Sequence, residues 1–531
     1  MEKSNKITII STESLALNGP RTLSSYLKKH GFFVQLISLS TFNDRFPDAV
    51  LDELWKISEN SLLLCFSCMS VTSKKISQVI SCLKPLGIPM VWGGIHATLN
   101  PEECLYHVDI VCRGEGEEAL LDLAQALKNE EKITKIKNLW VKQDGKIYKN
   151  DVRPLIQNTD TLPFPDYNFE SQYVMVGNKL ELLQENHITY GEYNPSNYML
   201  ATVGHFITSH ATRGCPYNCR YCTNYDLKKI YRGKGNFVRQ RSIKGVVSDL
   251  ASLRKKFPQL RFVWFTDDDF FLRDHEEISL FSKLYKEKVN LPFMCYVTPP
   301  SFTEDKLDLL VSAGLYIMEV GVQTGDQKFN QQVYNRGYAN ELLFKLSKKF
   351  NKYKGRVFPP VYQVMYMNPL EDECNTLQTI QLLRGLPRPF FLKIFNTVFF
   401  PGNAMYDKAK EELGKDIDLD KLYSFDYFDI FSHVSLKNKN LYLNLLIHYM
   451  ARRNTKHRSG IIPNFMLGFL TSKRVIAFNR RFSFFTRLML LIPTLSNIFW
   501  ITPKKYKGKC LEVILMAERM KNFFRRRLGL V

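Results

Sequence analysis

The sequence predicts an α/β protein made of two successive parallel-sheet domains and a basic, mainly helical C-terminal region. Strand-like apolar runs alternate with amphipathic helices over residues 6–130, as in βαβ units, and a second alternation follows a cysteine-rich stretch at 209–225. Residues 431–531 hold twenty Lys and Arg against two Glu, and so carry +18 of the net charge of +21. The expected divisions are domains at 1–150 and 201–430, a linker and entry segment at 151–200, and the basic region at 431–531.

The N-terminal domain is expected to be a doubly wound parallel sheet. Its strands are predicted at 6–11, 32–39, 61–70, 88–94 and 108–114, and its helices at 21–30, 73–87 and 117–129. Ligands of such sheets bind at the carboxyl ends of the strands, where this chain has loops rich in Gly, Ser and Thr. Ordinary strand-to-helix turns are the alternative reading of these loops. The candidate binding residues are Ser67, Ser70, Gly93, Gly94 and Glu115.

The second domain follows a proline-containing boundary near residues 155–170 and is expected to form a partial or complete parallel barrel. A helix is predicted at 242–257, because Val246, Val247, Leu250 and Leu253 share one face. Function in parallel barrels collects at the carboxyl ends of the strands. Polar clusters follow the predicted strands at 215–222, 267–269, 323–325 and 401–403, and these clusters are the candidate site.

Three cysteines in the stretch "TRGCPYNCRYC" have the spacing C-x₃-C-x₂-C, at Cys215, Cys219 and Cys222. Thiolates favour soft metals and iron–sulfur clusters, whereas structural zinc normally takes four protein ligands. No second C-x₂-C pair lies within reach of the loop in sequence, and the isolated Cys295 and Cys374 are expected to be core thiols. Three thiolates suit a cubane with one iron open to an outside ligand. A closed zinc site and three unrelated thiols are the alternatives.

The cysteine motif resembles the signature of the radical S-adenosylmethionine (radical SAM) superfamily, in which an aromatic residue, here Tyr221, precedes the third cysteine. The stretches "RQRS", "FTDDDF" and "GVQTG" match the same superfamily in order. The stretches "GGIHATLNPEE", "RGEGEEAL" and "LPFPDY" resemble the members that carry an N-terminal cobalamin-binding domain. The resemblance covers roughly residues 5–415, and it implies a cobalamin-binding type of doubly wound sheet followed by a TIM-like barrel.

The resemblance implies three cofactors: a 4Fe–4S cluster held by the three cysteines, S-adenosylmethionine chelated to the open iron, and cobalamin. Tyr221 would support the cluster loop near the adenine, and the "GVQTG" strand would approach the rest of S-adenosylmethionine. Asp267 and Asp268 match paired acids that point into the barrel, which makes them the catalytic candidates; a helix cap with solvated acids is the alternative. The cofactor-binding residues implied in the barrel are Tyr221, Arg239, Ser242, Gly321, Gln323 and Gly325.

The chain departs from the family pattern at four places. The first strand-to-helix loop contains no histidine, so cobalt is expected to lack an axial imidazole, and His96 is expected to be solvated or hydrogen-bonded. The usual G-x-P-G-E loop is replaced by "MNPLEDE" at 367–373, and Asn403 stands where Thr is common. Gln323 replaces a frequent Glu, and its amide can still hydrogen-bond to a hydroxyl or carboxylate.

The basic C-terminal region interleaves Lys and Arg with aromatic and aliphatic blocks. This composition suits a helix at the surface of an anionic membrane. A nucleic-acid surface and a helical cap on the barrel are the alternatives, and the large aliphatic blocks argue against nucleic acid. The apolar run at 482–501 is interrupted by Arg487 and Pro493 and is too short to span a bilayer. The N-terminus shows no secretory signal, so we expect cytoplasmic residence, with association at the membrane surface.

The function expected from the resemblance is radical SAM chemistry on an unactivated carbon, in the form of cobalamin-dependent methyl transfer to a small-molecule or lipid-like substrate. Oxidation or cyclisation on the same domain layout and RNA modification are alternative activities. An iron–sulfur electron carrier or sensor is the non-enzymatic alternative, and the S-adenosylmethionine motifs argue against it. An electron donor such as ferredoxin or flavodoxin is the expected partner.

Overall fold

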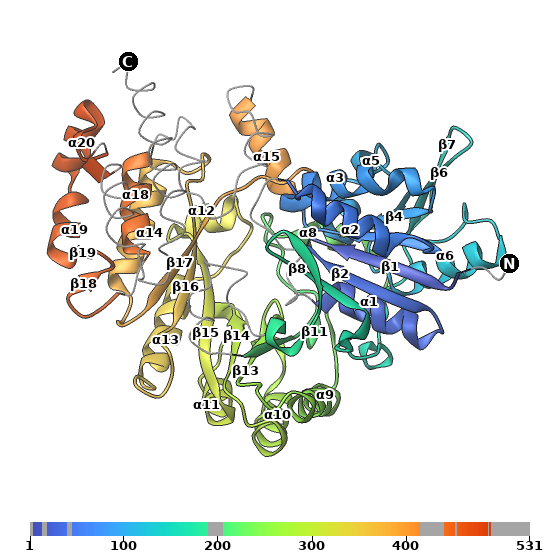
Figure 1. Ribbon diagram of the computed structural model, residues 1–531. Coiled ribbons are helices and arrows are strands. Elements are labelled where there is room, and N and C mark those ends of the chain that lie inside the picture. The colour runs from blue at the N-terminus through green and yellow to red at the C-terminus, as the bar shows by residue number, and fades with distance from the viewer. Residues whose placement is uncertain are drawn as a thin grey trace.

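The computed structural model describes residues 4–12, 18–39, 45–188, 205–414, 440–451, 454–486 and 488–489. Two α/β layers lie side by side, one in the N-terminal part of the chain and one in the middle, and short C-terminal helices flank the second (Figure 1). The mixed α/β class, with a parallel-dominated N-terminal sheet followed by a parallel sheet, confirms the predicted fold class.

The N-terminal sheet has nine strands in the order β7-β6-β5-β4-β3-β1-β2-β8-β9. Its central strands are parallel, and antiparallel pairs occur only toward the edges, at β5–β6–β7 and β8–β9. The strands are β1 (Lys6–Ser11), β2 (Phe33–Ser38), β3 (Leu63–Ser67), β4 (Met90–Gly93), β5 (Ile110–Cys112), β6 (Leu139–Gln143), β7 (Lys146–Lys149), β8 (Gln172–Val176) and β9 (Lys179–Leu182).

Helices cover both faces of this sheet because its central strands are apolar on both sides. One buried cluster joins Ile7 and Ile9 to Leu27 and Leu120, and another joins Ile10 to the opposite layer of helices. The helices are α1 (Asn18–Lys29), α2 (Asp48–Ser58), α3 (Ser73–Leu83), α4 (Gly94–Leu99), α5 (Pro101–Cys104) and α6 (Glu117–Asn129). The expected loop after β4 is therefore helical from Gly94 onward.

The segment expected to be a linker contributes β8 and β9 to the edge of the N-terminal sheet. Its attachment depends on Arg21 of α1, which is 2% exposed and donates to the carbonyl of Asp166 at 2.5 Å and to Gln172 Oε1 at 2.9 Å. Lys28 and Ser24 also donate to the Asp166 carboxylate. This attachment was not predicted from the sequence. The prolines indicated a domain boundary, and the two strands that follow them are too short to be recognised.

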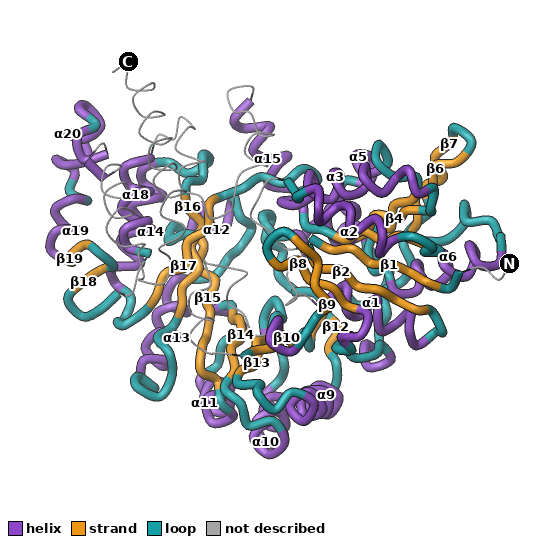
Figure 2. The backbone as a smooth tube through the Cα atoms, viewed as in Figure 1, coloured by secondary structure: helices purple, strands orange, loops and turns teal. Residues whose placement is uncertain are grey.

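The second sheet has six parallel strands in chain order, β10-β13-β14-β15-β16-β17, with helices on its outer side (Figure 2). No pairing between β10 and β17 closes it within the described residues, so it is a partial barrel. The strands are β10 (Phe206–Ser209), β13 (Phe262–Phe265), β14 (Phe293–Val297), β15 (Leu315–Gln323), β16 (Val361–Tyr366) and β17 (Phe391–Asn396). The helices are α8 (Thr223–Ile230), α9 (Ile243–Lys256), α10 (His275–Lys288), α11 (Glu304–Ala313), α12 (Gln327–Gln332), α13 (Asn340–Asn351), α14 (Glu373–Gly385) and α15 (Ala404–Leu413).

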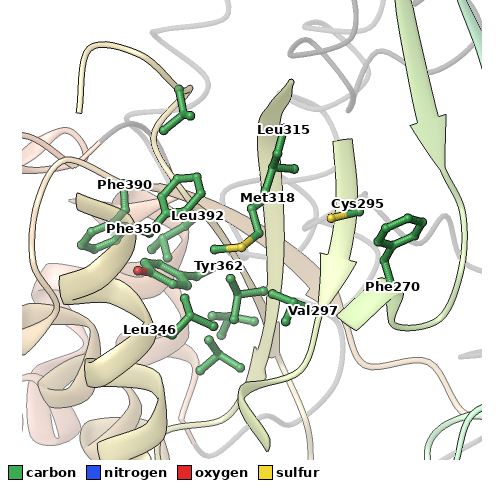
Figure 3. Close-up of a cluster of buried hydrophobic side chains, with 14 of the residues drawn as sticks. Phe270, Cys295, Val297, Leu315, Met318, Leu346, Phe350, Tyr362, Phe390 and Leu392 are labelled. Atoms are coloured by element: carbon green, nitrogen blue, oxygen red, sulfur yellow. The ribbon is translucent and has the colours of Figure 1, made fainter. Parts of the chain in front are cut away.

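The large core of the chain lies between this sheet and its helices. Figure 3 shows part of it, where Met318 of β15, Tyr362 of β16 and Phe350 of α13 pack together. Cys295 is fully buried on β14, as expected for a core thiol, but the same expectation for Cys374 was wrong, because that thiol is exposed on α14. A smaller apolar cluster, made of Phe206, Phe262, Met294, Ile317 and Val361, lies at the amino ends of the strands. This cluster leaves the polar residues toward the carboxyl ends.

The described part of the C-terminal region packs one apolar side of its helices on the barrel, in line with the helical-cap reading. Its elements are α18 (Leu441–Met450), β18 (Arg458–Ser459), β19 (Ile462–Pro463), α19 (Asn464–Leu470) and α20 (Lys473–Phe482). Seven apolar or aromatic residues of α18 join the main core. In the part of the chain that the structure describes, no helix is long and apolar enough to cross a bilayer. Most of the apolar run at 482–501 and the basic clusters after it lie outside the described residues.

Candidate cofactor site between the two sheets

The cysteine loop follows the short strand β11 (Thr212–Arg213) and ends where α8 begins. Gly214 has φ +83, and a Cβ there would lie 2.3 Å from the carbonyl oxygen of Phe237, so a glycine is needed to start the loop. Lys228 of α8 donates to the carbonyls of Pro216 and Tyr217, both at 2.7 Å. The loop is therefore fixed largely through its backbone carbonyls.

The three thiols of the loop differ in exposure: Cys219 is buried, and Cys215 and Cys222 are half-buried. Burial raises the pKa of the Cys215 and Cys222 thiols to about 12. Asn224 lies with its Nδ2 3.7 Å from Cys222 Sγ and donates to Asp268 Oδ2 at 2.9 Å. Bound iron would reverse the preference for the protonated thiols, because a coordinating thiol is deprotonated by the metal.

Among the described residues, no group of three or more His, Cys, Asp or Glu side chains is placed to hold one metal ion. A cubane makes a different demand, because its three thiolates bind three different irons. The chemistry of the donor set, three cysteines on one backbone-anchored loop, fits a cluster with one iron left for another ligand. Their assignment as ligands stays a prediction.

Tyr221 is held against the loop by an edge contact with Tyr334, at 5.1 Å between ring centroids. The backbone N–H of Arg220, one residue earlier, donates to the carbonyl of Tyr334 at 2.9 Å. This packing fits the predicted role of Tyr221 as a support for the loop. Sequence reasoning missed Tyr334, since an isolated tyrosine after a helix carries no motif.

The "GVQTG" strand is irregular where it was expected to approach S-adenosylmethionine. Gln323 has φ +69, and the pairing of β15 with β16 shifts between Gly321 and Gln323. Arg336 and Tyr338 both donate to the Gly321 carbonyl at 3.0 Å, and a Cβ on Gly321 would lie 2.8 Å from Arg336 Nη2. The bulge turns the backbone away from regular pairing, as bulges near binding sites do.

The structure gives Gly325 and Ser242 local packing and capping contacts. A Cβ on Gly325 would lie 2.6 Å from the Cα of Thr379 in α14, so the glycine permits that helix to approach. Ser242 caps α9 by accepting from the N–H of Gly245 at 3.1 Å. Binding of S-adenosylmethionine by either residue is untested and stays a prediction.

The three acids after β13 lie in different environments. Asp267 is fully buried and accepts from the N–H of Ala211 at 3.2 Å, whereas Asp268 is exposed and faces Asn224 beside Cys222. Asp269 caps the turn that follows, and burial raises its pKa to about 6. The cap is thus formed by Asp269, and not by Asp267 or Asp268, for which the alternative reading expected it. The catalytic assignment of Asp267 and Asp268 stays a prediction, and Asp268 is the one next to the cysteine loop.

The candidate cobalamin loops meet at Gly94, which has φ +84. A Cβ there would lie 2.9 Å from Ser67 Oγ and 3.1 Å from the carbonyl of Cys68, so the glycine lets the β3 and β4 loops touch. A Cβ on Gly93 would meet atoms only at 3.6 Å or beyond, so the protein itself does not require a glycine there. The site at Gly93 can therefore accept a ligand atom where another residue would place a side chain.

His96 is the histidine nearest these loops in sequence, and its ring is fully buried. Its Nδ1 lies 3.2 Å from Ser70 Oγ, and its Nε2 lies 3.6 Å from the carboxylate of Glu103. Nδ1 is hydrogen-bonded, as the hydrogen-bonded reading predicted, whereas Nε2 has only the longer contact with Glu103. The residues around Gly93 thus fit a corrinoid bound without an imidazole from His96.

Glu115 joins the two domains. It accepts from both terminal nitrogens of Arg239 at 2.9 and 2.8 Å and from Arg213 at 2.9 Å, while Arg213 also donates to Glu117 at 2.5 Å. Burial acts to raise the pKa of Glu115, but the guanidinium groups of Arg239 and Arg213 hold it below its usual range. Two residues predicted to bind different cofactors, Glu115 and Arg239, are thus partners of each other.

Helix α8 also links the cysteine loop to the N-terminal domain. It begins directly after Cys222, and Tyr231 at its end accepts from the N–H of Glu115 at 2.6 Å. Gly114 has φ +79, and a Cβ there would lie 1.8 Å from the Tyr231 hydroxyl. The cysteine loop and the β5–α6 loop therefore hold fixed positions relative to each other.

A second connection runs through the turn at 401–403. Asn403 donates to Asp226 of α8 at 3.0 Å, and Asn100 of the N-terminal domain donates to the carbonyl of Pro401 at 3.0 Å. Gly402 has φ +77, and a Cβ on it would lie 2.7 Å from the carbonyl of Leu99. Asn403, the departure from the usual Thr, is therefore both a cap of α15 and a link to the cysteine-loop helix.

We expect Glu115→Gln to weaken the association of the two domains. The amide keeps the shape of the carboxylate but loses the charge that two guanidinium groups share, at a cost of about 2 kcal/mol in the free energy of unfolding. Urea unfolding followed by tryptophan fluorescence measures the change. Glu118→Gln is the matched control, since Glu118 is half-exposed and has a longer contact of 3.5 Å with Arg153. Equal effects of the two substitutions would contradict the bridging role.

The "MNPLEDE" loop retains a buried carboxyl group at Glu371, which is 6% exposed. Burial raises its pKa to about 8, and the nearby carboxylates of Asp326 and Asp372 act in the same direction. Met367 has φ +55 at the place of the first glycine of the G-x-P-G-E pattern. The loop thus keeps the pattern's Pro369 and Glu371 while placing a methionine in a backbone conformation that favours glycine.

The pH dependence of stability follows from Glu371. Since its pKa is higher in the folded chain than in the unfolded one, its contribution is complete below about pH 4.3 and is lost as the pH rises through about 8. In the wild type, the free energy of unfolding should fall over this range by about 1.4 kcal/mol for each unit of difference between the folded and unfolded pKa of Glu371. Glu371→Gln should remove this part of the decline. Midpoints measured from pH 5 to 9 test this, with the exposed Glu341→Gln as control. A decline unchanged in Glu371→Gln would contradict it.

A charged pair on the barrel side of the second sheet was not predicted. Glu319 of β15 is fully buried. Its carboxylate accepts hydrogen bonds from Lys393 of β17 at 3.1 Å and from Gln363 of β16 at 2.5 Å. The three residues stand on adjacent strands, above the small apolar cluster. A single Glu within an apolar strand was the only sequence signal for a buried carboxylate. Its partners could not be predicted, because they lie 44 and 74 residues away in the sequence.

Comparisons with known proteins agree with this arrangement. Residues 210–383 match the Radical SAM superfamily model, and residues 17–124 match the B12 binding domain model. The uncharacterized methyltransferase PH0819 of Pyrococcus horikoshii is 26% identical over 244 residues, which are 45% of this chain and 46% of that protein. The anaerobic magnesium-protoporphyrin IX monomethyl ester cyclase of Rubrivivax gelatinosus is 23% identical over 320 residues, 57% of this chain and 51% of the relative. The matches span about half the length of these two relatives.

A solved structure shares the fold. It is that of the radical S-adenosylmethionine methyltransferase TsrM from Kitasatospora setae with cobalamin and a 4Fe-4S cluster bound. Its TM-score is 0.57 at 17% identity, and the match covers 77% of this chain and 78% of that chain.

The fold and the three-cysteine loop define the class of a radical SAM protein. Within that class, the chain carries an N-terminal B12-binding domain, as predicted from the resemblance of its sequence motifs. A radical SAM domain implies a 4Fe–4S cluster and S-adenosylmethionine as cofactors, and a B12-binding domain implies cobalamin. The predicted cofactor set is thereby confirmed at the level of the domains.

Proposed function

We propose that the chain is a cobalamin-dependent radical SAM enzyme that transfers a methyl group to an unactivated carbon of a small molecule. The observation that carries the proposal is the shared interface of the two cofactor-binding domains. Helix α8 starts directly after Cys222, and Tyr231 at its end contacts Glu115, so the predicted cluster loop is anchored to a loop of the B12-binding domain. Methyl transfer needs these two cofactors close to one substrate.

Different residues of this chain would bind the different cofactors. When bound, the cluster with S-adenosylmethionine would supply a hydrogen-abstracting radical, and cobalamin would supply the methyl group. Cys215, Cys219 and Cys222 would hold the cluster, and Lys228 fixes their loop by its backbone. The bulge at Gly321–Gln323 would orient S-adenosylmethionine, and the loops at Gly93 would hold the corrinoid. Ferredoxin or flavodoxin would deliver the electron.

The test uses protein reconstituted anaerobically with iron, sulfide and hydroxocobalamin, then separated from unbound corrinoid. We expect retained corrinoid absorbance, and 5′-deoxyadenosine on addition of S-adenosylmethionine and dithionite. With methyl-deuterated S-adenosylmethionine, an extract containing the substrate should yield a product that carries the label. A cluster-loaded protein that cleaves S-adenosylmethionine but retains no corrinoid would overturn the cobalamin-dependent proposal.

Cyclisation or oxidation is the second candidate, supported by the similarity to a protein named as a cyclase. A product that loses hydrogen without gaining labelled methyl would favour this candidate over methyl transfer. A lipid-like substrate is our proposal for the acceptor class, supported by the C-terminal helices described next.

A further inference from the structure

Helix α19 is apolar on its exposed side as well as on its buried side. Leu467 and Leu470 pack into the main core, while Phe465 and Phe469 are 79% and 62% exposed. A surface helix of a water-soluble domain normally turns polar side chains outward. The sequence of α19 is "NFMLGFL", which offers almost none.

Helix α20, which follows α19 in the chain, and the residues after it also expose aromatic side chains. Val475 and Ile476 are buried, whereas Phe478, Phe482 and Phe484 are 46%, 53% and 55% exposed. The rings of Phe478 and Phe482 are 4.9 Å apart, so these side chains form a cluster. We call the exposed side chains of this region the aromatic face; its members are Ile461, Phe465, Met466, Phe469, Phe478, Phe482, Phe484 and Leu488.

The aromatic face is concentrated in a small part of the chain. Eight of the eighteen exposed large hydrophobic residues among the described positions fall within residues 461–488. Exposed apolar side chains scattered singly need no explanation, but their concentration in one segment, with rings in mutual contact, indicates an interaction site.

The segment that carries the aromatic face has charges of one sign, and one of its cations, Arg480, pairs with Glu373 of α14 at 2.7 Å. Residues 440–489 contain no Asp or Glu. Six Lys and Arg lie among the described residues there, at positions 456, 458, 473, 474, 480 and 481. Arg481 lies over the ring of Phe482, at 5.4 Å from its centroid. Cations interleaved with exposed rings complement a surface that is both anionic and apolar.

We infer that the aromatic face binds the surface of an anionic lipid membrane. The buried halves of α19 and α20 fix both helices on the barrel, for example through Tyr442, which donates to the carbonyl of Leu470 at 2.8 Å. Their outward Phe side chains enter the boundary between headgroups and acyl chains, while Lys and Arg meet the anionic headgroups. This inference is independent of the reaction proposed above and gives a lipid-like substrate a route to the enzyme.

The chemistry of the face favours a membrane over nucleic acid or a second copy. Single-stranded nucleic acid stacks on aromatic rings, but Ile461, Met466 and Leu488 offer no ring for stacking. A second copy would bring the same cations against each other, and the segment itself has no acid to pair them; Glu373 of α14 is already paired with Arg480. A lipid surface accommodates aliphatic, aromatic and cationic groups together.

The test is vesicle flotation of the full-length reconstituted protein. We expect it to float with vesicles of phosphatidylcholine and phosphatidylglycerol, less so at high salt, and little with phosphatidylcholine alone. The double substitution Phe465→Ser/Phe469→Ser should weaken binding to the anionic vesicles more than about tenfold, a loss of about 1.4 kcal/mol or more. Tyr106→Ser is the matched control, since Tyr106 is 82% exposed on the N-terminal domain.

Two further measurements keep the outcomes separate. Absence of binding to anionic vesicles, or binding that the double substitution leaves unchanged, would overturn the inference. If the wild type bound single-stranded RNA or associated with itself, and the variant lost that binding while its vesicle binding stayed unchanged, the result would overturn the inference. RNA or a second copy would then be the partner of the aromatic face. Cleavage of S-adenosylmethionine, measured in the same samples without a lipid substrate, should be equal in wild type and variant. Failure at the membrane is thus distinguishable from failure of the proposed function.

Discussion

Replacing Cys219 with alanine should abolish both cluster binding and the formation of 5′-deoxyadenosine. Cys219 is the buried thiol of the three, on a loop whose backbone is held by Lys228 and Tyr334. A cubane held by two cysteines loses a ligand at one iron, which ordered water does not replace. The expected loss of S-adenosylmethionine cleavage is more than about 100-fold, because removal of a ligand exceeds the 10–100-fold effect of outer partners.

Iron and sulfide content per chain and the visible absorbance after anaerobic reconstitution measure the first effect, and chromatography of 5′-deoxyadenosine measures the second. Cys374→Ala is the matched control, since Cys374 is exposed and outside the loop. A circular-dichroism melt shared with the wild type would show that the fold survives. Cys219→Ala protein that keeps four irons and cleaves S-adenosylmethionine would refute the ligand assignment.

Replacing Lys393 with methionine should destabilise the barrel by about 3–5 kcal/mol, since it leaves Glu319 buried without its cation. Gln363 would remain as a hydrogen-bond donor, but an amide does not neutralise the carboxylate. The change should appear as a lower urea midpoint with an unchanged slope. It belongs to the largest class of single-residue effects, because the carboxylate is fully buried.

The double variant Lys393→Met/Glu319→Gln isolates the cause. If the cost arises from an unpaired buried charge, removing the charge should recover most of the lost stability. Lys349→Met is the matched control, because its partner Asp308 is half-exposed and stays hydrated when the lysine is lost. A midpoint for Lys393→Met no lower than that of Lys349→Met would refute the importance of the pair.

Much of the fold could be predicted because buried parallel strands are continuous apolar runs. The segments that became β1, β15 and β17 read as strands from composition alone, and their alternation with helices fixed the class. The pair β8 and β9 could not be read in this way. These strands are short, lie at the sheet edge and follow prolines, and they attach through the distant Arg21.

The candidate site was also predictable only where the signal is local in the sequence. The cysteines were predictable because the cluster chemistry imposes a local spacing. Glu115 and Arg239 were both found, but each was assigned to a cofactor, since the pairing of residues 124 positions apart leaves no trace in local sequence. Asn224 and Lys228 were missed for a different reason: a polar side chain on a short helix carries no signal until the loop it contacts has a known path.

The sharing of Glu115 by two arginines also limits how this architecture can change over evolution. A substitution at 115 would leave Arg213 and Arg239 facing each other, and Arg239 is only 5% exposed in its side chain. Related chains are therefore expected to change positions 115, 213 and 239 together rather than singly. Exchanging the B12-binding domain between relatives should succeed when this set of three travels with it.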